Sequence, residues 1–317
     1  MTRRQRKKAI TRRHMLAYAG LAAAGVAAGY GGLKALDDLT SATSKPALQD
    51  IPDVVSANVG EAVPSDPDSS AWKKAKAVQV ALAGQQVILP LRPEPSVPTV
   101  EVRSLHDGGR VAFRLEWADD RQDDLSIKID QFRDSCGVLL GAYPASSTVW
   151  LMGTAESPAT ILQWRADWQR DVDLGFQDLE VAFPNVAFDF YPPLVNAARP
   201  LKLPDAYPKE ARMWLPGWRV GNPLSQPVKQ SPVHKLRAIG PGTLEAQATQ
   251  DARGRGVWED GKWKVVLVKP MTASDKDELA LSPGSTYSLA FTVWSGSDRD
   301  AGSRKSLTQL GKLTLEA

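Results

Sequence analysis

From Ala71 onward, the 317-residue chain carries a series of short segments in which apolar and polar residues alternate, and this pattern most constrains its fold. Two-residue alternation turns one side of an extended strand toward a core and the other side away from it. Turn-forming residues separate the segments, and 24 Gly and 23 Pro along the chain favour many turns over long helices. We therefore predict an all-β fold, an immunoglobulin-like β-sandwich over residues 71–317.

Two hairpins are the clearest predicted elements. In the first, residues 100–104 and 111–117 alternate on either side of a turn at residues 106–109. In the second, residues 259–261 form the turn before an apolar run at residues 263–268. Each pair is expected to form two antiparallel strands with apolar side chains on one face.

The remaining segments complete the predicted sheets. Further strands are expected at residues 78–84, 85–93, 134–144, 148–153, 159–172, 285–298 and 304–317. Residues 159–172 fit helical spacing as well as alternation, and we assign them to a strand. Residues 176–216, rich in Pro and aromatic residues, are expected to form a long insertion over one end of the sheets.

The N-terminal region has the composition of an export signal. Residues 1–33 combine a basic start with 19 uncharged residues at 15–33, mostly Ala and Gly. The sequence TRRHML, with Arg12 and Arg13, resembles a twin-arginine signal, which implies a periplasmic location. The alternative is an uncleaved membrane anchor, because roughly 20 apolar residues span a bilayer. Residues 34–70, rich in Ser, Pro, Asp and Ala, are expected to be a flexible linker.

The chain offers few side chains for catalysis or for an ordinary metal site. Cys136 is the single cysteine, which excludes a disulfide framework, a thiolate metal site and covalent haem attachment through CxxCH. Three histidines, at positions 14, 106 and 234, are too few for a histidine-rich zinc or copper site. Motifs of hydrolases and nucleotide-dependent enzymes are missing. Beyond residue 33, 32 basic residues face 36 acidic residues, so we expect no nucleic-acid binding.

Methionine and lysine are therefore the candidate ligands that remain. Met152 lies in a turn of small residues between two tryptophan-bearing segments, within WLMGTAESPATILQW. A methionine there either fills a gap in the core or binds a metal through its thioether. A lysine binds iron only as the neutral amine, in a desolvated pocket. The residues alone leave these alternatives open.

Five parts of the sequence carry a family resemblance. They are VRSLHDGGRVAFRLEWADD (102–120), TVWLMG followed by ILQWRADWQ (148–169), RVGNPLSQ (219–226), GRGVWEDGKWKVVLVKP (254–270) and LAFTVWSGSDRDAGSRKSLTQLGKLTLE (289–316). In this order they resemble the haem b-binding domain of the ethylbenzene dehydrogenase γ-subunit family. The resemblance covers nearly all of the chain from residue 71 to the end.

The resemblance implies a β-sandwich related to the cytochrome domains of extracellular dehydrogenases. Such a domain holds one haem b, without a covalent bond, between a methionine and a lysine. The matching positions in this chain are Met152 and Lys305. Lys269 and Lys229 are the alternatives for the lysine ligand.

The resemblance also implies a role in electron transfer. Two protein ligands leave the iron no open position, so the chain is not expected to be an enzyme by itself. Trp150 and Trp164 are expected to line an apolar pocket that excludes water. The implied partner is a molybdenum-containing oxidoreductase with an iron–sulfur subunit, or a c-type cytochrome. The chain departs from the family pattern in its long insertion and in its own export signal. The alternative function is a haem-free β-sandwich module that binds a ligand or another protein of the cell envelope.

Overall fold

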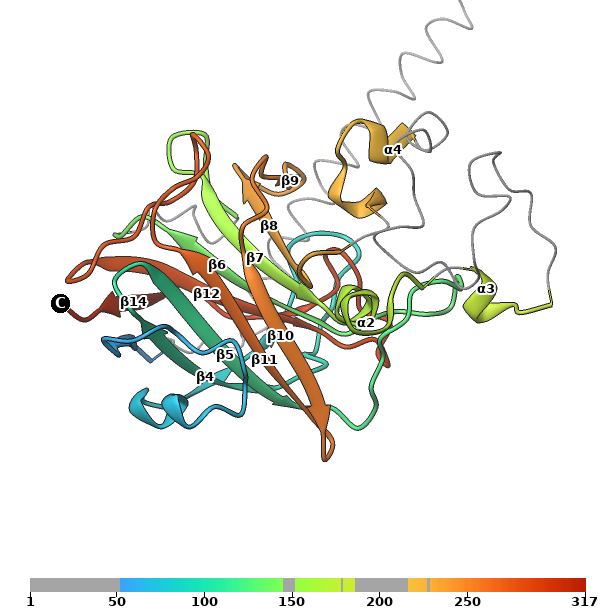
Figure 1. Cartoon of the computed structure of the whole chain (residues 1–317), viewed down its shortest axis with the longest axis horizontal. Helices are drawn as coiled ribbons and strands as arrows, with labels where there is room; N and C mark the ends of the chain where they lie inside the picture. The colour runs from blue at the N-terminus through green and yellow to red at the C-terminus, as the bar shows by residue number, and fades with distance from the viewer. Residues whose placement is uncertain (1–51, 145–151, 178, 186–215, 227–228) are drawn as a thin grey trace, which may run out of the picture. The chain divides into compact units, whose positions relative to one another are not determined.

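The alternating segments form one hydrogen-bonded sheet that folds back on itself into two facing layers (Figure 1). The computed structural model describes residues 52–144, 152–177, 179–185, 216–226 and 229–317. The strands are β1 Val54–Asn58, β2 Val78–Ala81, β3 Ala83–Gly84, β4 Thr99–His106, β5 Arg110–Ala118, β6 Ser135–Gly141, β7 Ala159–Arg165, β8 Val233–Ala238, β9 Glu245–Ala246, β10 Arg253–Glu259, β11 Lys262–Pro270, β12 Thr286–Trp294, β13 Ser306–Leu307 and β14 Gly311–Leu315. The predicted all-β sandwich is confirmed.

The strand order explains how two layers arise from one sheet. The order is β10-β11-β5-β4-β1-β14-β12-β6-β7-β8-β9, with β2 on β4 and β13 on β12. We call β10, β11, β5 and β4 the first layer, and β12, β6, β7 and β8 the second layer. Strand β1 pairs in parallel with β4 on one side and with β14 on the other, so it joins the two layers.

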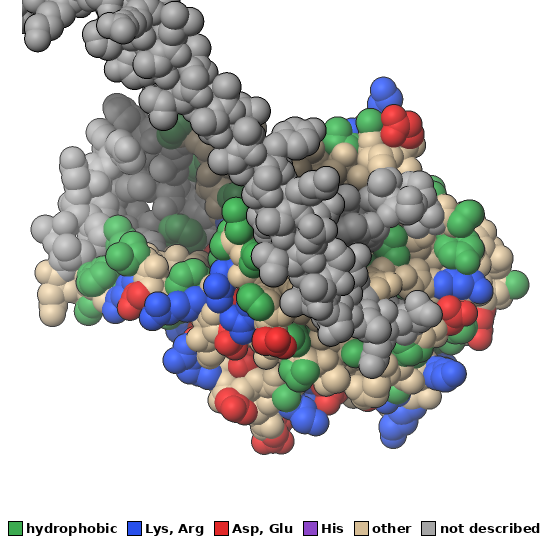
Figure 2. Space-filling model, turned by 180° about the vertical axis from the view of Figure 1, so that it is seen from behind, with side chains coloured by type: hydrophobic (Ala, Val, Ile, Leu, Met, Phe, Trp, Pro, Cys, Tyr) green, Lys and Arg blue, Asp and Glu red, His purple; other side chains and the backbone are tan. Residues whose placement is uncertain are grey.

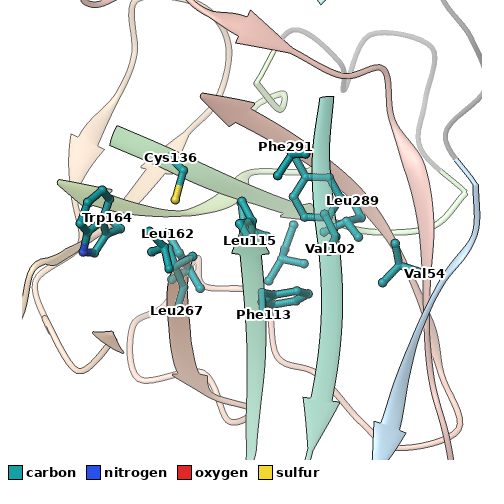
Figure 3. Packing of buried hydrophobic residues seen from close by; sticks show 14 of the residues in the cluster. Val54, Val102, Phe113, Leu115, Cys136, Leu162, Trp164, Leu267, Leu289 and Phe291 are labelled. Carbon is teal, nitrogen blue, oxygen red and sulfur yellow. The ribbon is translucent and has the colours of Figure 1, made fainter. Parts of the chain in front are cut away.

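The main core lies between the two layers and is built from one side of each strand (Figure 3). The first layer contributes Val102, Phe113, Leu115 and Leu267, and the second contributes Cys136, Leu162, Trp164, Leu289 and Phe291. All nine are almost fully buried. Burying a side chain of this size contributes roughly 1.5–3 kcal/mol, so this core is the main source of the fold's stability.

Three tryptophans close one part of this core. The ring centroid of Trp164 lies 4.8 Å from that of Trp263 and 6.4 Å from that of Trp117. The indole nitrogen of Trp164 donates a hydrogen bond to Gln169 Oε1 over 3.2 Å, and the backbone N–H of Gly256 donates to the same oxygen over 2.8 Å. Gln169 belongs to helix α2 (Ala166–Leu174), so this helix is tied to the core through one amide side chain.

The helical segments are short. Besides α2 they are η1 Ser70–Lys74, α3 Leu179–Ala182, α4 Pro216–Arg219 and η5 Pro223–Ser225. No helix among the described residues is long and apolar enough to cross a membrane. The predicted signal at residues 1–33 and most of the predicted insertion at 176–216 lie outside the described residues.

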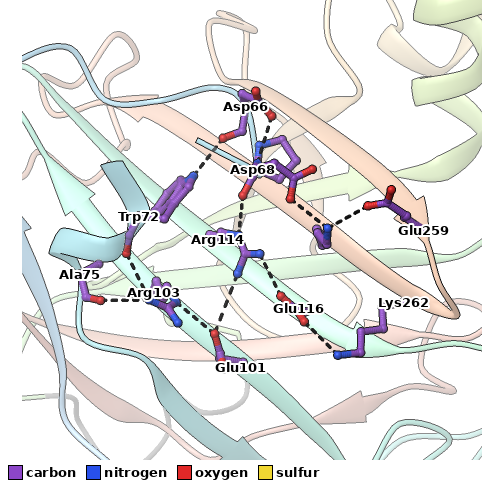
Figure 4. A network of polar contacts seen from close by, with 12 residues as sticks. Asp66, Asp68, Trp72, Ala75, Glu101, Arg103, Arg114, Glu116, Glu259 and Lys262 are labelled. Atoms are coloured by element: carbon purple, nitrogen blue, oxygen red, sulfur yellow. Dashed lines mark hydrogen bonds and ion pairs between the residues drawn. The ribbon is translucent and has the colours of Figure 1, made fainter. Parts of the chain in front are cut away.

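The outer face of the first layer is covered by the segment before β2, which packs on an apolar cluster and beside it forms polar contacts (Figure 4). The cluster comprises Trp72, Ala75, Leu105, Ala112, Val266 and Val268. Arg114 Nε donates to the carbonyl of Pro67 over 2.7 Å, and Arg103 Nη1 donates to that of Trp72 over 3.2 Å. Arg114 also forms an ion pair with Glu116, at 2.8 Å. Charged side chains and carbonyl groups therefore satisfy one another on this side of the sandwich.

Both predicted hairpins are confirmed. The first joins β4 to β5, and Val111, Phe113, Leu115 and Trp117 are buried in the core. The second joins β10 to β11 through Asp260 and Gly261, which both have left-handed backbone conformations, with φ of 51° and 71°. Left-handed residues at both central positions match the right-handed twist of the strands in a tight hairpin.

Three sequence expectations differ from the structure. Residues 159–172 are a strand only as far as Arg165, because the core-facing alternation ends there and helix α2 begins. Residues 85–93 form a loop, in which the side chain of Gln85 accepts hydrogen bonds from the backbone of Val87 and Ile88 in place of a strand neighbour. The predicted linker at 34–70 contains β1, so the sheet begins before Ala71.

Gly256→Ala is expected to lower the free energy of unfolding. A β-carbon on Gly256 would lie 2.2 Å from Cζ2 of Trp164, whose ring is fixed by its neighbours and by Gln169. Overpacking of this kind costs about 1–3 kcal/mol, measurable by urea denaturation. In the control Gly109→Ala, the nearest atom, Asp107 Oδ1, would lie 3.4 Å away, and a change below about 0.5 kcal/mol is expected. Equal stabilities of the two variants would contradict this packing.

Candidate functional site

The outer face of the second layer also carries apolar side chains. On β6, Cys136, Val138 and Leu140 point into the main core, so Gly137 and Leu139 lie on the opposite side. On β7 the same alternation puts Leu162 and Trp164 in the core and Ile161 and Gln163 outside. A second apolar surface is therefore built from the same strands.

A separate cluster forms on this outer face. It comprises Leu139, Ala159, Ile161, Leu236 and Ala238, with Met152, Ala290 and Leu310 packed against it. The first five side chains are at most 9% exposed. Met152, the predicted ligand, thus lies on the outer face of the second layer and not in the main core.

The turn that holds Met152 is anchored to the ends of β7 and β8. Gly153 forms a bridge with Pro158, and the N–H of Gly240 donates to the carbonyl of Met152 over 3.1 Å. A β-carbon on Gly153 would lie 2.5 Å from the carbonyl oxygen of Ala238, so only glycine fits there. Met152 has a φ of 76°, a conformation that non-glycine residues seldom adopt away from functional sites and tight turns.

Lys305, the second predicted ligand, precedes β13 at the other end of the same face. The pairing of Ser306 with Val293 sets Lys305 beside Trp294, and its Nζ lies 5.2 Å from the centre of the indole ring. Among the described residues, no side chain or carbonyl forms an ion pair or hydrogen bond with this Nζ. Burial lowers the pKa of Lys305 to about 8, which brings the neutral amine within reach at physiological pH.

Gly137 connects the lysine end of the face to the methionine end. A β-carbon on Gly137 would lie 2.8 Å from Thr292 Oγ1 and 3.6 Å from Cζ3 of Trp294, so these two side chains share its face. Leu139, two residues further along the same strand, belongs to the Met152 cluster. Met152 and Lys305 therefore lie on one face, with Gly137 and Leu139 on the sheet between them.

A third group on this face was missed by the sequence reasoning. His234 pairs in register with Gln163, is 5% exposed, and stacks on Trp168 of α2 with ring centroids 5.0 Å apart. Arg165 and Lys229 also lie over the Trp168 ring, at 4.7 Å and 4.9 Å from its centre. The signal in the sequence was the two-residue spacing of Gln163 and Arg165, which puts both side chains on the face of β7 that points away from Trp164.

Two sequence-predicted site residues do not join this face, and one cannot be placed. Trp164 was expected to line the pocket with Met152, but its even position on β7 turns its side chain into the main core, on the other side of the strand from Met152. Lys269 is fully buried, with Nζ 3.3 Å from Glu278 Oε1. Trp150 lies outside the described residues. Lys229, the other alternative to Lys305 as the lysine ligand, lies over the ring of Trp168.

The donor set of the outer face suits a thioether and an amine better than an ordinary metal site. Among the described residues, no three His, Cys, Asp or Glu side chains gather in a way that would hold a metal ion. Cys136 is buried in the main core, and burial raises the pKa of its thiol well above the usual value. A sulfur ligand on this face would therefore come from Met152, and a nitrogen ligand at its other end from Lys305.

The wild-type protein is expected to lose stability between pH 7 and pH 5 because of His234. Burial, with the charges of Arg165 and Lys229, lowers the pKa of His234 to about 4, while the unfolded value is 6.5. The unfolded chain therefore binds this proton first as the pH falls, and stability drops from about pH 6.5 toward pH 4. Urea denaturation at pH 7 and at pH 5 gives the loss in the free energy of unfolding for each protein. We expect this loss to be roughly 1–2 kcal/mol larger for the wild type than for His234→Phe. Equal losses in the two proteins would contradict a buried neutral imidazole.

The known proteins that this chain is similar to include a relative in sequence and two solved structures. A Haloferax mediterranei protein, provisionally named respiratory nitrate reductase heme subunit ORF7, is 22% identical over 267 residues, which cover 84% of this chain and 73% of that protein. Two carbohydrate-binding modules of family 9 from Caldicellulosiruptor kristjanssonii, in complex with glucose and with cellotriose, are 7% and 8% identical. Each covers 84% of this chain and 96% or 94% of its own, with TM-scores of 0.38 and 0.35. Such low scores carry no functional argument.

The family model described as ethylbenzene dehydrogenase matches residues 69–306, which are most of the chain. This match confirms the resemblance carried by the five sequence segments. The chain belongs to the ethylbenzene dehydrogenase family.

Proposed function

We propose that this chain is an exported haem protein that transfers single electrons, with haem b bound without a covalent bond between Met152 and Lys305. The proposal is supported by the family to which the chain belongs and by a relative that is named a haem subunit. Its main support from the geometry is the state of Lys305, which lies on the face that carries Met152 and has no charged partner among the described residues.

Lys305 has the properties that an amine ligand to iron requires. An ammonium group cannot bind a metal, so the lysine must lose its proton first. Burial beside Trp294 lowers the pKa of Lys305 to about 8, and among the described residues no carboxylate holds the charged form in place. Lys269, by contrast, is held by Glu278, and Lys229 donates to the carbonyl of Pro223 over 3.3 Å.

Met152 would supply the opposite ligand. A thioether is a soft, neutral ligand that favours ferrous iron and raises the potential. Its turn is fixed to β7 and β8 through Gly153 and Gly240, so the sulfur has a defined position above the cluster. The side chains of Leu139 and Ile161 give this part of the face an apolar surface, which excludes water from a flat macrocycle.

The bound haem would supply one-electron chemistry between ferrous and ferric iron. The chain's own residues bind it on both sides, keep water away and leave no position for oxygen or a substrate. We infer that the catalytic step belongs to a partner, a molybdenum-containing oxidoreductase with an iron–sulfur subunit, and that a c-type cytochrome is the alternative partner. The name of the Haloferax relative supports a partner of the nitrate reductase kind.

We also propose export to the periplasm, on the basis of Arg12 and Arg13 in the twin-arginine-like segment. In the view of Figure 2, basic, acidic and apolar side chains are interspersed among the described residues, without a broad basic area.

Met152→Ala and Lys305→Ala are each expected to weaken haem binding by roughly tenfold or more and to convert the iron from low spin to high spin. Loss of the thioether in Met152→Ala is further expected to lower the reduction potential. The measurements are optical titration with hemin, spectra of the reduced protein and potentiometry. Lys262→Ala is the control, because Lys262 is exposed on the first layer and pairs with Glu116; its spectrum and potential are expected to match those of the wild type.

Two results would contradict the proposal. A colourless protein from haem-replete cells that also takes up no hemin in vitro would favour the haem-free binding module. An unchanged low-spin spectrum in Lys305→Ala would exclude Lys305 as the ligand and would leave haem binding itself intact.

A further inference from the structure

We infer that the side chains of Arg165, Lys229 and His234, around the ring of Trp168, bind the two propionate carboxylates of the haem. We call these four residues the cationic corner. The inference rests on the proposed function and extends it, since it assigns the orientation of the porphyrin on the outer face of the second layer.

The register of the strands puts the cationic corner beside the line that joins the two ligands. Met152 lies at the end of the layer where Ala159 pairs with Ala238. Lys305 lies at the other end and on the other edge, beside Trp294. His234 is on the same edge as Ala238 and close to the opposite end of its strand. The line from Met152 to Lys305 therefore crosses the layer diagonally, and the cationic corner lies to one side of this line.

A flat macrocycle held between two axial ligands extends sideways from the line that joins them. One of its edges therefore faces the cationic corner. The propionates are the only charged substituents at the edge of haem b, and they are acceptors of hydrogen bonds. Arginine, lysine and histidine N–H groups are the usual donors to a carboxylate.

His234 provides the observation that points to a ligand. Its Nε2 atom is buried and has no hydrogen-bond partner among the described residues, and the whole residue is 5% exposed. Buried polar atoms are nearly always paired in folded proteins. A carboxylate oxygen at this position would accept the N–H of the neutral imidazole.

The charges of the corner leave room for an anion. Asp167 is shared by Arg165, at 3.3 Å, and Arg133, at 3.2 Å. Asp171 is the remaining carboxylate near Lys229, and burial raises its pKa to about 6. Among the described residues, three basic side chains thus face two carboxylates, and the hydrogen bonds of Lys229 go to carbonyl oxygens of its own loop. A charged carboxylate is a stronger acceptor than a carbonyl, so Lys229 has reason to turn to it.

The opposite corner of the face provides a matched control. There Lys312 pairs in register with Ser288 on β12, which points away from the core. Lys312 already has a carboxylate partner, Asp53, at 3.6 Å, and its side chain is 38% exposed. A propionate at that corner would compete with an existing ion pair.

The test compares two porphyrins in the full-length protein, protohaem and its dimethyl ester, in which both carboxylates are blocked. The rate of haem transfer to excess apomyoglobin is measured for the wild type, Lys229→Met, His234→Phe and Lys312→Met. We expect Lys229→Met and His234→Phe to lose protohaem about tenfold faster than the wild type, and to lose the ester at nearly the wild-type rate. Lys229→Arg is expected to restore slow loss of protohaem, and Lys312→Met to behave as the wild type with both porphyrins.

Equal acceleration for protohaem and ester would overturn the inference, because it would indicate a structural role for these side chains. Faster loss of protohaem from Lys312→Met alone would assign the propionates to the opposite corner. Should the wild type take up neither porphyrin, the proposed function fails, and this inference fails with it. A low-spin spectrum of each loaded variant serves as the check on folding and on the axial ligands.

Discussion

The two-residue alternation of the second-layer strands is the constraint on which the rest of the structure depends. The side chains at even positions of β6 and β7, such as Val138 and Leu162, form the main core against the first layer. Those at odd positions, such as Leu139 and Ile161, form a second apolar surface on the other side. A one-residue shift in register would exchange the two sets, so the core and the site are specified together.

The three parts of the proposed site, which are Met152, Lys305 and the cationic corner, lie where strands begin or end. The glycine-supported turn that carries Met152 precedes β7, and Gly240, just after β8, donates a hydrogen bond to it. The segment before β13 carries Lys305 beside Trp294. Helix α2 begins directly after β7 and brings Trp168 over His234. The first layer also has an apolar cluster on its outer face, but Trp72 and Ala75 of the segment before β2 cover it. Arg103 and Arg114 bind that segment through its carbonyl groups. The site is thus restricted to one face by packing as well as by chemistry.

Much of the fold could be predicted from the sequence, because alternation and turn chemistry act locally. The two hairpins and the burial of residues such as Trp117 needed only the spacing of apolar residues and the position of Gly and Asp. Helix α2 and the loop at residues 85–93 were missed because a tertiary contact helps to decide each one. Gln169 accepts a hydrogen bond from the backbone of Gly256, and Gln85 donates one to the carbonyl of Ser303. The parallel pairing of β1 joins residues far apart in sequence, which no local pattern reveals. Residue type suggested Met152, and the family pattern suggested Lys305, but the corner at His234 required the register between β7 and β8.

The central claim is that a thioether from the outer face of the second layer binds iron. The most direct test is X-ray absorption at the iron edge of the haem-loaded protein, prepared with methionine and with selenomethionine. We expect one sulfur neighbour of the iron in the first coordination shell, replaced by selenium in the labelled protein and absent from Met152→Ala. A first shell of nitrogen and oxygen alone, unchanged by selenium labelling, would contradict it.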